Sequence, residues 1–234
     1  MSEVKPKPLV PADYLYHLPD KPLPQGSISY EEFLEWVDED THAEWVDGEI
    51  HMTSPASYKH QNIKGFLESV FREFVEAFDL GEVLSAGFQM KLPGKSGSGR
   101  EPDIIFISKP RLNLLRKTFL DGPADLAIEV VSPESIERDR ITKLMEYAAG
   151  GVLEYWLLDP NLQEAIFYGL DPQGQYQAKP LDSAGKYYSQ VIAGFWLKPE
   201  WLWREPLPAV KDVLKLVGGA AYQNYLTQPP ASDL

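Results

Sequence analysis

The residues with the clearest potential for chemistry lie between positions 101 and 159. Two apolar runs in this stretch each contain one carboxylate, Asp103 in the first and Glu129 in the second. A carboxylate inside an apolar strand is unfavourable unless a cation or hydrogen bonds compensate it. The helical pattern that follows contains a lysine, Lys143, which could supply that charge. We therefore expect the function to lie in this stretch.

Asp103 and Glu129 together favour a metal site. If their strands are neighbours, the two side chains converge near one edge of the sheet, where their charges repel. A divalent hard cation resolves such repulsion, and Mg²⁺ suits two carboxylates with a main-chain carbonyl and retained waters, Mn²⁺ being an alternative. Such an ion activates water and neutralises the charge that develops on a phosphate oxygen.

The cation of the site must come from the helix, because position 131 on the strand is Val. Asp139, Lys143 and Tyr147 are spaced i, i+4 and i+8, so they form one stripe along the helix. We expect this stripe to lie beside the apolar face of the helix and to overhang the end of the sheet. The apolar positions are Ile141, Leu144, Met145 and Ala148.

Each of these residues also has a purely structural interpretation. Asp103 follows a proline and could hydrogen-bond at a strand start. Glu129 could be the buried partner of an arginine. Lys143 could be a surface lysine that pairs only with Asp139. Tyr147 is typical of a half-buried packing residue, so we leave it out of the catalytic set.

Three further polar residues are candidates for accessory roles. Glu44 precedes a hairpin and is either a surface residue or a further carboxylate near the metal. His60 lies in the first turns of a long helix and is either structural or in contact with the substrate or its phosphate. Gln89 either faces the site or pairs across strands, and the sequence does not choose between these.

The elements that position these residues follow from local patterns. Ser29 and Glu32 form a capping box that starts a short helix, and Asp47-Gly48 between apolar runs predicts a hairpin. Residues 58–79 have the apolar period of a long amphipathic helix. Further strands are expected at 82–92, around Asp103 and Glu129, and at 154–158, 164–168, 176–179 and 187–196, with helices at 135–150 and 210–217.

This order of strands and helices predicts an α/β domain with a mixed sheet. We expect a proline-rich arm at residues 1–26, the main domain at 27–204, and a C-terminal helix with a loose tail at 205–234, the tail beginning at Gly218. The apolar stripe at 210–217 and the aromatic residues before it suggest a homodimer as a hypothesis.

The composition limits the classes of function. A formal net charge of −13 argues against indiscriminate binding of polyanions, although ten of the 22 Lys and Arg residues lie between positions 91 and 143. These residues either form a local basic surface or are ordinary solvated charges on loops. The absence of cysteine excludes disulfides and thiolate metal sites. With no hydrophobic signal segment and no run that could span a bilayer, we expect a cytoplasmic protein.

The ordered motifs resemble a known superfamily. Pro102-Asp103, followed by Glu129 between apolar neighbours, is similar to the PD-(D/E)XK nuclease signature without its strand lysine. Within that superfamily the chain resembles a large bacterial family of restriction-endonuclease-like proteins of unknown biological role, over residues 27–197. The matching motifs are Asp47-Gly48-Glu49, Ser54-Pro55, His60, Pro102-Asp103, Glu129-Val130-Val131-Ser132-Pro133, Asp139 with Lys143 and Tyr147, and Glu154 to Pro160.

This resemblance implies a restriction-endonuclease-like mixed central sheet flanked by helices, with an N-terminal hairpin and a C-terminal hairpin extension. It implies Mg²⁺ held by Asp103, Glu129 and the carbonyl of Val130, with Lys143 taking the place of the strand lysine. The implied activity is that of a Mg²⁺-dependent endonuclease, which hydrolyses DNA phosphodiester bonds by a metal-activated water.

Two other functions stay open at this level. The chain could be a catalytically silent relative that binds nucleic acid or a protein partner, because fold does not determine function. It could also be a metal hydrolase of small phosphate esters, which would require a narrow pocket. Convergence of Asp103, Glu129 and Lys143 on one open site within metal-binding reach would favour the nuclease, whereas Lys143 in solvent, or paired only with Asp139, would favour the binding module.

Overall fold

The structure is a computed structural model, which describes residues 22–24, 26–38, 41, 43–52, 56–93 and 98–227. Most of the proline-rich arm and the Ser54-Pro55 motif lie outside the described residues. Within the described part of the chain, no helix is both long enough and apolar enough to cross a membrane.

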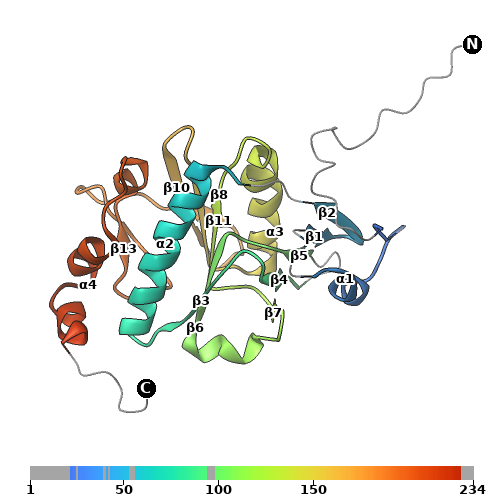
Figure 1. Cartoon of the computed structure of the whole chain (residues 1–234), viewed down its shortest axis with the longest axis horizontal. Coiled ribbons are helices and arrows are strands. Elements are labelled where there is room, and N and C mark those ends of the chain that lie inside the picture. Colours follow the sequence, from blue (N-terminus) through green and yellow to red (C-terminus); the bar gives the residue numbers. More distant parts are fainter. Residues whose placement is uncertain are drawn as a thin grey trace, which may run out of the picture.

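A six-stranded mixed sheet forms the centre of the fold (Figure 1). In spatial order its strands are β11 (Tyr176–Ala178), β10 (Glu164–Leu170), β9 (Glu154–Asp159), β8 (Leu126–Val130), β6 (Ile104–Ser108) and β3 (Gly81–Ser85). Strands β8 and β9 are parallel, and the other neighbours are antiparallel. Asp103 directly precedes β6 and Glu129 lies in β8, and these two strands are neighbours, which is the condition for the two carboxylates to converge.

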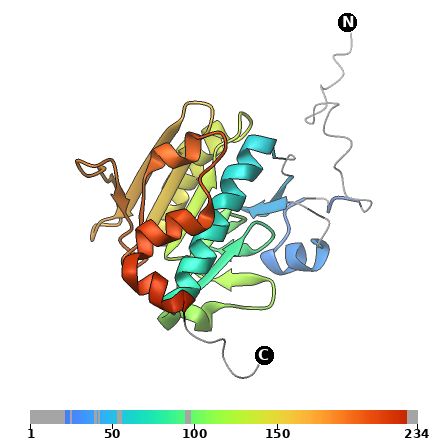
Figure 2. The same ribbon diagram turned by 60° about the vertical axis from the view of Figure 1, so that its left-hand side comes forward.

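Two helices, α2 (Tyr58–Ala77) and α4 (Val210–Leu226), cover one face of this sheet, and they lie side by side in Figure 2. The long amphipathic helix predicted at 58–79 is confirmed. Its apolar face packs on the strands, and the rings of Phe71 and Trp156 have centroids 5.4 Å apart. Phe195, from the C-terminal segment, stacks on the same helix, 4.7 Å from the Phe71 ring.

The other face of the central sheet packs against α3 (Lys143–Gly150) and a second sheet through a separate apolar cluster. In spatial order the second sheet contains β2 (Glu49–Met52), β1 (Ala43–Val46), β5 (Ser98–Arg100), β4 (Gln89–Lys91) and β7 (Phe119–Asp121). Helix α1 (Tyr30–Trp36) packs on this sheet, with the Tyr30 ring 5.5 Å from the Trp45 ring. Short 3₁₀ segments occur at Lys109–Leu114 and Pro199–Trp203.

The two N-terminal local motifs are confirmed. Strands β1 and β2 form an antiparallel hairpin, and its turn residues Asp47 and Gly48 have φ of 52° and 88°, as a two-residue hairpin turn requires. At the start of α1, the Ser29 hydroxyl accepts a hydrogen bond from the Glu32 amide, and the Glu32 carboxylate accepts one from the Ser29 amide.

The continuous strand predicted at 82–92 is wrong. Strand β3 ends at Ser85 and β4 begins at Gln89, and the two strands belong to different sheets. Between them Gly87 has φ of 98°, a conformation that favours glycine. The turn carries the chain from the central sheet to the second sheet, so Gln89 lies in a different sheet from the strand that follows Asp103.

The single strand predicted at 187–196 is also wrong. The segment contains two short antiparallel strands, β12 (Tyr187–Tyr188) and β13 (Trp196–Leu197), with a loop between them. The hairpin predicted from residues 164–168 and 176–179 is confirmed as β10 and β11, which extend the central sheet at one edge.

The expectation of a loose tail from Gly218 is wrong for the described residues. Helix α4 continues to Leu226 through a kink at Gly219, and Tyr222 is buried and donates a hydrogen bond to Glu73 of α2. The apolar stripe at 210–217 packs into the core beside α2. It therefore does not provide the surface on which the homodimer hypothesis rested.

Glu154, at the start of β9, is a buried carboxylate that ties the C-terminal segment to the sheet. Its oxygens accept hydrogen bonds from Trp156 Nε1 (2.5 Å), Tyr187 OH (2.8 Å), Ser189 Oγ (3.0 Å) and the amides of Gln190 (2.8 Å) and Val191 (3.2 Å). Most of these donors come from the β12–β13 segment, so one side chain holds that segment in place.

We expect Glu154→Ala to lower the free energy of unfolding by about 3 kcal/mol or more, because it leaves two buried donors and three partly buried ones without this acceptor. Urea unfolding measures this change. The matched control is Glu200→Ala, since Glu200 is exposed and pairs only with Arg204 in the structure. The control should change stability by less than about 1 kcal/mol. Equal effects of the two substitutions would contradict the role of Glu154.

Candidate active site

Asp103 lies where the ladder between β6 and β8 ends. Ile104 pairs with Ile128 in this antiparallel ladder. Asp103, which precedes Ile104, and Glu129, which follows Ile128, are therefore the next residues along the two strands. One Asp103 oxygen accepts a hydrogen bond from the Val130 amide at 2.8 Å, and the other lies 3.0 Å from His60 Nε2. Burial would raise the pKa of Asp103, but the His60 contact and the Val130 amide hold it below its usual value. Asp103 is therefore an oriented, ionised carboxylate.

Glu129 lies in β8 and points to the α3 side of the sheet. Its Oε1 accepts hydrogen bonds from Lys143 Nζ at 2.9 Å and from Tyr147 OH at 2.6 Å. Burial raises the pKa of Glu129 to about 8; Lys143 opposes this shift, and nearby carboxylates including Asp139 and Asp103 add to it. Lys143 therefore only partly offsets the effects of burial and of the other carboxylates on Glu129.

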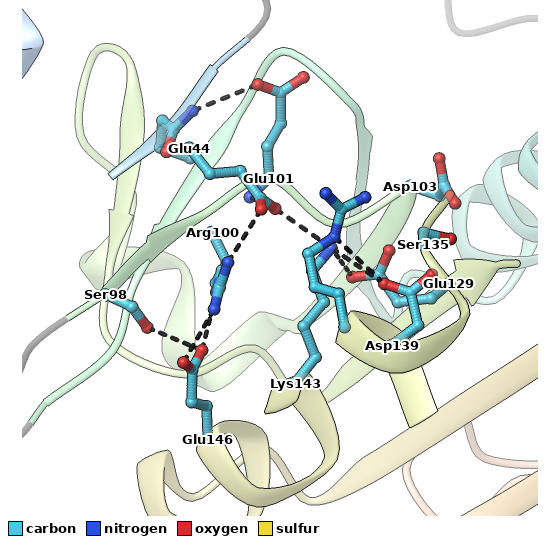
Figure 3. Close-up of polar contacts among 12 residues, drawn as sticks. Glu44, Ser98, Arg100, Glu101, Asp103, Glu129, Ser135, Asp139, Lys143 and Glu146 are labelled. Atoms are coloured by element: carbon cyan, nitrogen blue, oxygen red, sulfur yellow. Dashed lines mark hydrogen bonds and ion pairs between the residues drawn. The ribbon is translucent and has the colours of Figure 1, made fainter. Parts of the chain in front are cut away.

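Lys143 is the centre of this cluster (Figure 3), and only 2% of its side chain is exposed. Its ammonium lies 2.9 Å from Glu129, 3.1 Å from Glu44 and 3.7 Å from Asp139. Burial would lower the pKa of Lys143, but these three carboxylates raise it well above its usual value. Lys143 is neither a surface lysine nor a partner of Asp139 alone. It forms one cluster with Glu129, Glu44 and Asp139, and Asp103 lies close enough to this cluster to raise the pKa of Glu129.

The predicted orientation of the helix that carries Lys143 is wrong. The stripe of Asp139, Lys143 and Tyr147 is itself the buried face, whereas Ile141 and Met145 are 52% and 62% exposed. The chain at Arg138–Thr142 forms a turn of π-helix before α3 begins. Such single turns often occur at functional sites. Lys143 forms ion pairs with Glu129 and Glu44, which compensate the cost of burying its charge. Hydrophobicity therefore does not decide which face of the helix packs inward.

Glu44 is also part of the cluster, which makes the surface interpretation of this residue wrong. Its Oε1 lies 3.1 Å from Lys143 Nζ, and its Oε2 accepts a hydrogen bond from Arg100 at 3.0 Å. Burial would raise the pKa of Glu44, but Lys143 and Arg100 lower it to about 2. Glu44 is thus a fixed anion that joins the second sheet to the site.

Arg100 and Glu146 hold Glu44 in this position, and the sequence analysis identified neither of them. Arg100, in β5, donates two hydrogen bonds to the Glu146 carboxylate of α3, at 2.7 Å and 2.8 Å. This forked pair connects the second sheet to α3. Glu146 follows Lys143 by three residues, and no local sequence pattern links it to an arginine 46 positions earlier.

The structure separates the other two accessory candidates. His60, near the start of α2, contacts Asp103 directly and is 8% exposed, so it belongs to the site. Gln89 is buried in the second sheet and donates hydrogen bonds to the Ala43 carbonyl (3.1 Å) and to Glu101 (3.2 Å). Gln89 therefore braces strands of the second sheet, as its cross-strand interpretation predicted.

The donor set fits a divalent cation. Asp103 and Glu129 supply hard oxygen ligands, and burial together with neighbouring carboxylates raises the pKa of Glu129 even though Lys143 is beside it. Within the described residues, no three His, Cys, Asp or Glu side chains are grouped so that they could hold a metal ion by themselves. Two carboxylates with a main-chain carbonyl and waters are the kind of ligand set that Mg²⁺ accepts.

The raised pKa of Glu129 generates a pH prediction. In the unfolded chain this carboxyl titrates near 4.5, so its stabilising contribution is present below that pH and is lost as the pH rises to about 8. We expect the unfolding free energy of the wild type to fall relative to that of Glu129→Gln over this range, by up to about 1.4 kcal/mol per pH unit. Above about pH 8 the difference should level off.

Urea unfolding at pH 5, 6, 7, 8 and 9 measures this difference. Glu164→Gln is the matched control, because Glu164 lies on the exposed side of β10 and pairs with Arg140 in the structure. A difference between wild type and Glu129→Gln that stays constant from pH 5 to pH 8 would mean that Glu129 is already ionised at pH 5.

Comparison with known proteins places this geometry in a family. The family Uma2, described as "Putative restriction endonuclease", matches residues 30–200. The chain is 27% identical over 143 residues to the uncharacterized protein slr1290 of Synechocystis sp. (strain PCC 6803), a match that covers 61% of this chain and 72% of the relative.

A crystal structure from Anabaena variabilis ATCC 29413, described as a "putative nuclease belonging to DUF820", superposes with a TM-score of 0.63. The superposition covers 75% of this chain and 97% of that one at 19% identity, so it shows a shared fold. The family match covers most of the chain and includes both carboxylate strands and α3. This protein therefore belongs to the Uma2 family of restriction-endonuclease-like proteins, which supports a nuclease function.

Proposed function

We propose that this protein is a Mg²⁺-dependent endonuclease that hydrolyses phosphodiester bonds of DNA. The observation that carries the proposal is the pair Asp103 and Glu129, a half-buried carboxylate directly before β6 and a buried one in the neighbouring strand β8, where Lys143 is the counter-ion of Glu129. Membership of a restriction-endonuclease-like family supports the same conclusion.

In this proposal Asp103, Glu129 and the carbonyl of Val130 hold the metal ion. When bound, Mg²⁺ would supply an activated water and would neutralise charge on the phosphate. The surrounding residues keep these ligands in place. His60 and the Val130 amide fix the two oxygens of Asp103, and Lys143 and Tyr147 fix Oε1 of Glu129.

Lys143 acts through its charge in this arrangement. Its raised pKa, caused by Glu129 and the other nearby carboxylates against the effect of burial, keeps it protonated. A protonated lysine cannot accept a proton from water, so Lys143 stabilises the ionised carboxylates and is not a general base. Preorganised charge of this kind lowers the cost of reorganisation during reaction.

The rival functions receive less support. Lys143 contacts Glu44 and Glu129 as well as Asp139, so it does not have the arrangement, in solvent or paired only with Asp139, that would favour a silent binding module. A pocket of about 330 Å³ lies between α3 and the β10–β11 turn, where its lining includes Leu144 and Tyr176. Neither Asp103 nor Glu129 lines that pocket, so it does not support hydrolysis of a small phosphate ester.

We expect the isosteric variants Asp103→Asn and Glu129→Gln to lose nicking of supercoiled DNA by about a hundredfold or more, since each removes one proposed metal ligand. Both should also weaken Mg²⁺ and Mn²⁺ binding measured by calorimetry. Glu164→Gln makes the same change in charge on an exposed strand residue and should nick DNA like the wild type. Removal of metal by EDTA should stop nicking, and added Mg²⁺ should restore it.

Three results of this experiment have distinct meanings. Loss of both binding and nicking in the two variants, with unchanged far-UV circular dichroism, would support the proposal. If the wild type binds metal but does not cleave DNA, the nuclease function is contradicted and the metal site is still supported. Nicking that survives in both variants would contradict the site itself.

A further inference from the structure

Arg138 is a cation of the acidic cluster that the sequence analysis did not single out. It is the first residue of the π-helical turn that precedes α3. Its Nε lies 3.7 Å from Oδ1 of Asp139, the residue that also approaches Lys143. The turn therefore places a guanidinium beside the carboxylates that surround Lys143.

Exposure distinguishes Arg138 from the other cations of the cluster. Its side chain is 34% exposed, whereas the side chains of Lys143 and Arg100 are 2% and 3% exposed. Lys143 and Arg100 are enclosed by their carboxylate partners, so neither can meet a large substrate without displacing them. Arg138 reaches both the buried cluster and solvent.

Hydrogen bonding distinguishes Arg138 further. No described residue accepts a hydrogen bond from its guanidinium, and its buried Nε is unsatisfied, as is Oδ1 of Asp139. By contrast, Arg100 donates three hydrogen bonds to Glu44 and Glu146. A partly buried arginine close to carboxylates normally uses its fork of N–H donors. At Arg138 the fork is available for another acceptor.

The charges around Arg138 explain why it stays in this place without hydrogen bonds. Burial would lower its pKa, but the carboxylates of Glu44, Asp139 and Glu129 outweigh that effect and raise it. Arg138 is thus held near the metal-ligand candidate Glu129 by long-range attraction. Such a side chain can turn toward an incoming anion at small cost.

We infer that Arg138 binds the scissile phosphate, its guanidinium fork donating to non-bridging oxygens. This inference rests on the proposed nuclease function and names a substrate contact for it. A guanidinium matches the geometry of a phosphate with two parallel hydrogen bonds and does not lose its charge. It also stabilises the negative charge that builds on phosphate oxygens during transfer.

The assignment divides the cationic role that the resemblance gave to Lys143. Lys143 is enclosed by Glu129, Glu44 and Asp139, so it holds Glu129 in position and favours its ionised form. Arg138 contacts the substrate. A cluster with two enclosed cations, Lys143 and Arg100, and an accessible Arg138 can keep its carboxylates in place while the substrate enters and leaves.

The test compares Arg138→Gln and Arg138→Lys with Arg72→Gln, a control on α2 whose arginine is exposed and pairs with Glu68. We expect Arg138→Gln to nick DNA about a hundredfold more slowly than the wild type. Arg138→Lys should recover little of this loss, because a lysine cannot donate the forked pair. Arg72→Gln should match the wild type.

Binding provides a readout that is independent of cleavage. With Ca²⁺ in place of Mg²⁺, the affinity of a fluorescent 16-base-pair duplex is measured at several salt concentrations. Arg138→Gln should bind the duplex more weakly, and the slope of log affinity against log salt should fall in magnitude by about one. Urea unfolding and calorimetric Mg²⁺ titration should show that the variant is folded and still binds metal.

The outcomes separate this inference from the proposed function. Two results together would overturn the phosphate contact: a wild-type nicking rate in Arg138→Lys, and an unchanged salt slope in Arg138→Gln. The slower nicking of Arg138→Gln would then be explained by the lost positive charge alone. If the wild type does not cleave DNA, inorganic phosphate replaces the duplex as the probe, and its binding is measured by ³¹P NMR. Weaker phosphate binding in Arg138→Gln, but not in Arg72→Gln, would then support Arg138 as a phosphate site although the nuclease function fails. Equal binding in both variants would overturn it.

Discussion

The burial of the Lys143 ammonium among three carboxylates is the interaction on which the rest of this site depends. An unpaired buried ammonium would cost several kcal/mol, so its partners must be close and fixed. Glu129 approaches from the central sheet, Glu44 from the second sheet, and Asp139 from the preceding turn of the same helix. One side chain thereby joins both sheets and α3. The Arg100–Glu146 fork then holds the second sheet and α3 in register around it.

This interaction also sets unequal properties for the carboxylates around it. Glu44 meets Lys143 and Arg100 and has a pKa lowered to about 2, whereas burial raises the pKa of Glu129 to about 8. Two cations, Lys143 and Arg100, outweigh the effect of burial at Glu44, whereas Lys143 offsets the effect of burial at Glu129 only in part. A site with that imbalance is suited to receive a divalent cation beside Glu129 and an anionic substrate beside an accessible arginine.

Local sequence signals predicted the fold well where a single segment contained all the information. The Asp47-Gly48 hairpin, the Ser29 capping box and the long helix α2 required only short-range turn, cap and periodicity rules. Predictions failed where a glycine redirected the chain between distant elements. Gly87 divides one apparent strand between two sheets, and the kink at Gly219 allows the C-terminal helix to continue along α2. In both places the final conformation depends on packing partners far away in the sequence.

The sequence by itself determined that Asp103 and Glu129 are carboxylates set in apolar strands, and that Lys143 follows at a helical spacing. That was sufficient to identify the carboxylates and the lysine, because strand alternation and helical period are local properties. Only the tertiary structure decided which face of the helix is buried. Hydrophobicity favoured Ile141 and Met145, but ion pairs with residues from both sheets turned the charged stripe inward. The positions of Arg100 and Arg138 were likewise decided in three dimensions, since an arginine's role depends on which carboxylates surround it, and those carboxylates come from separate elements.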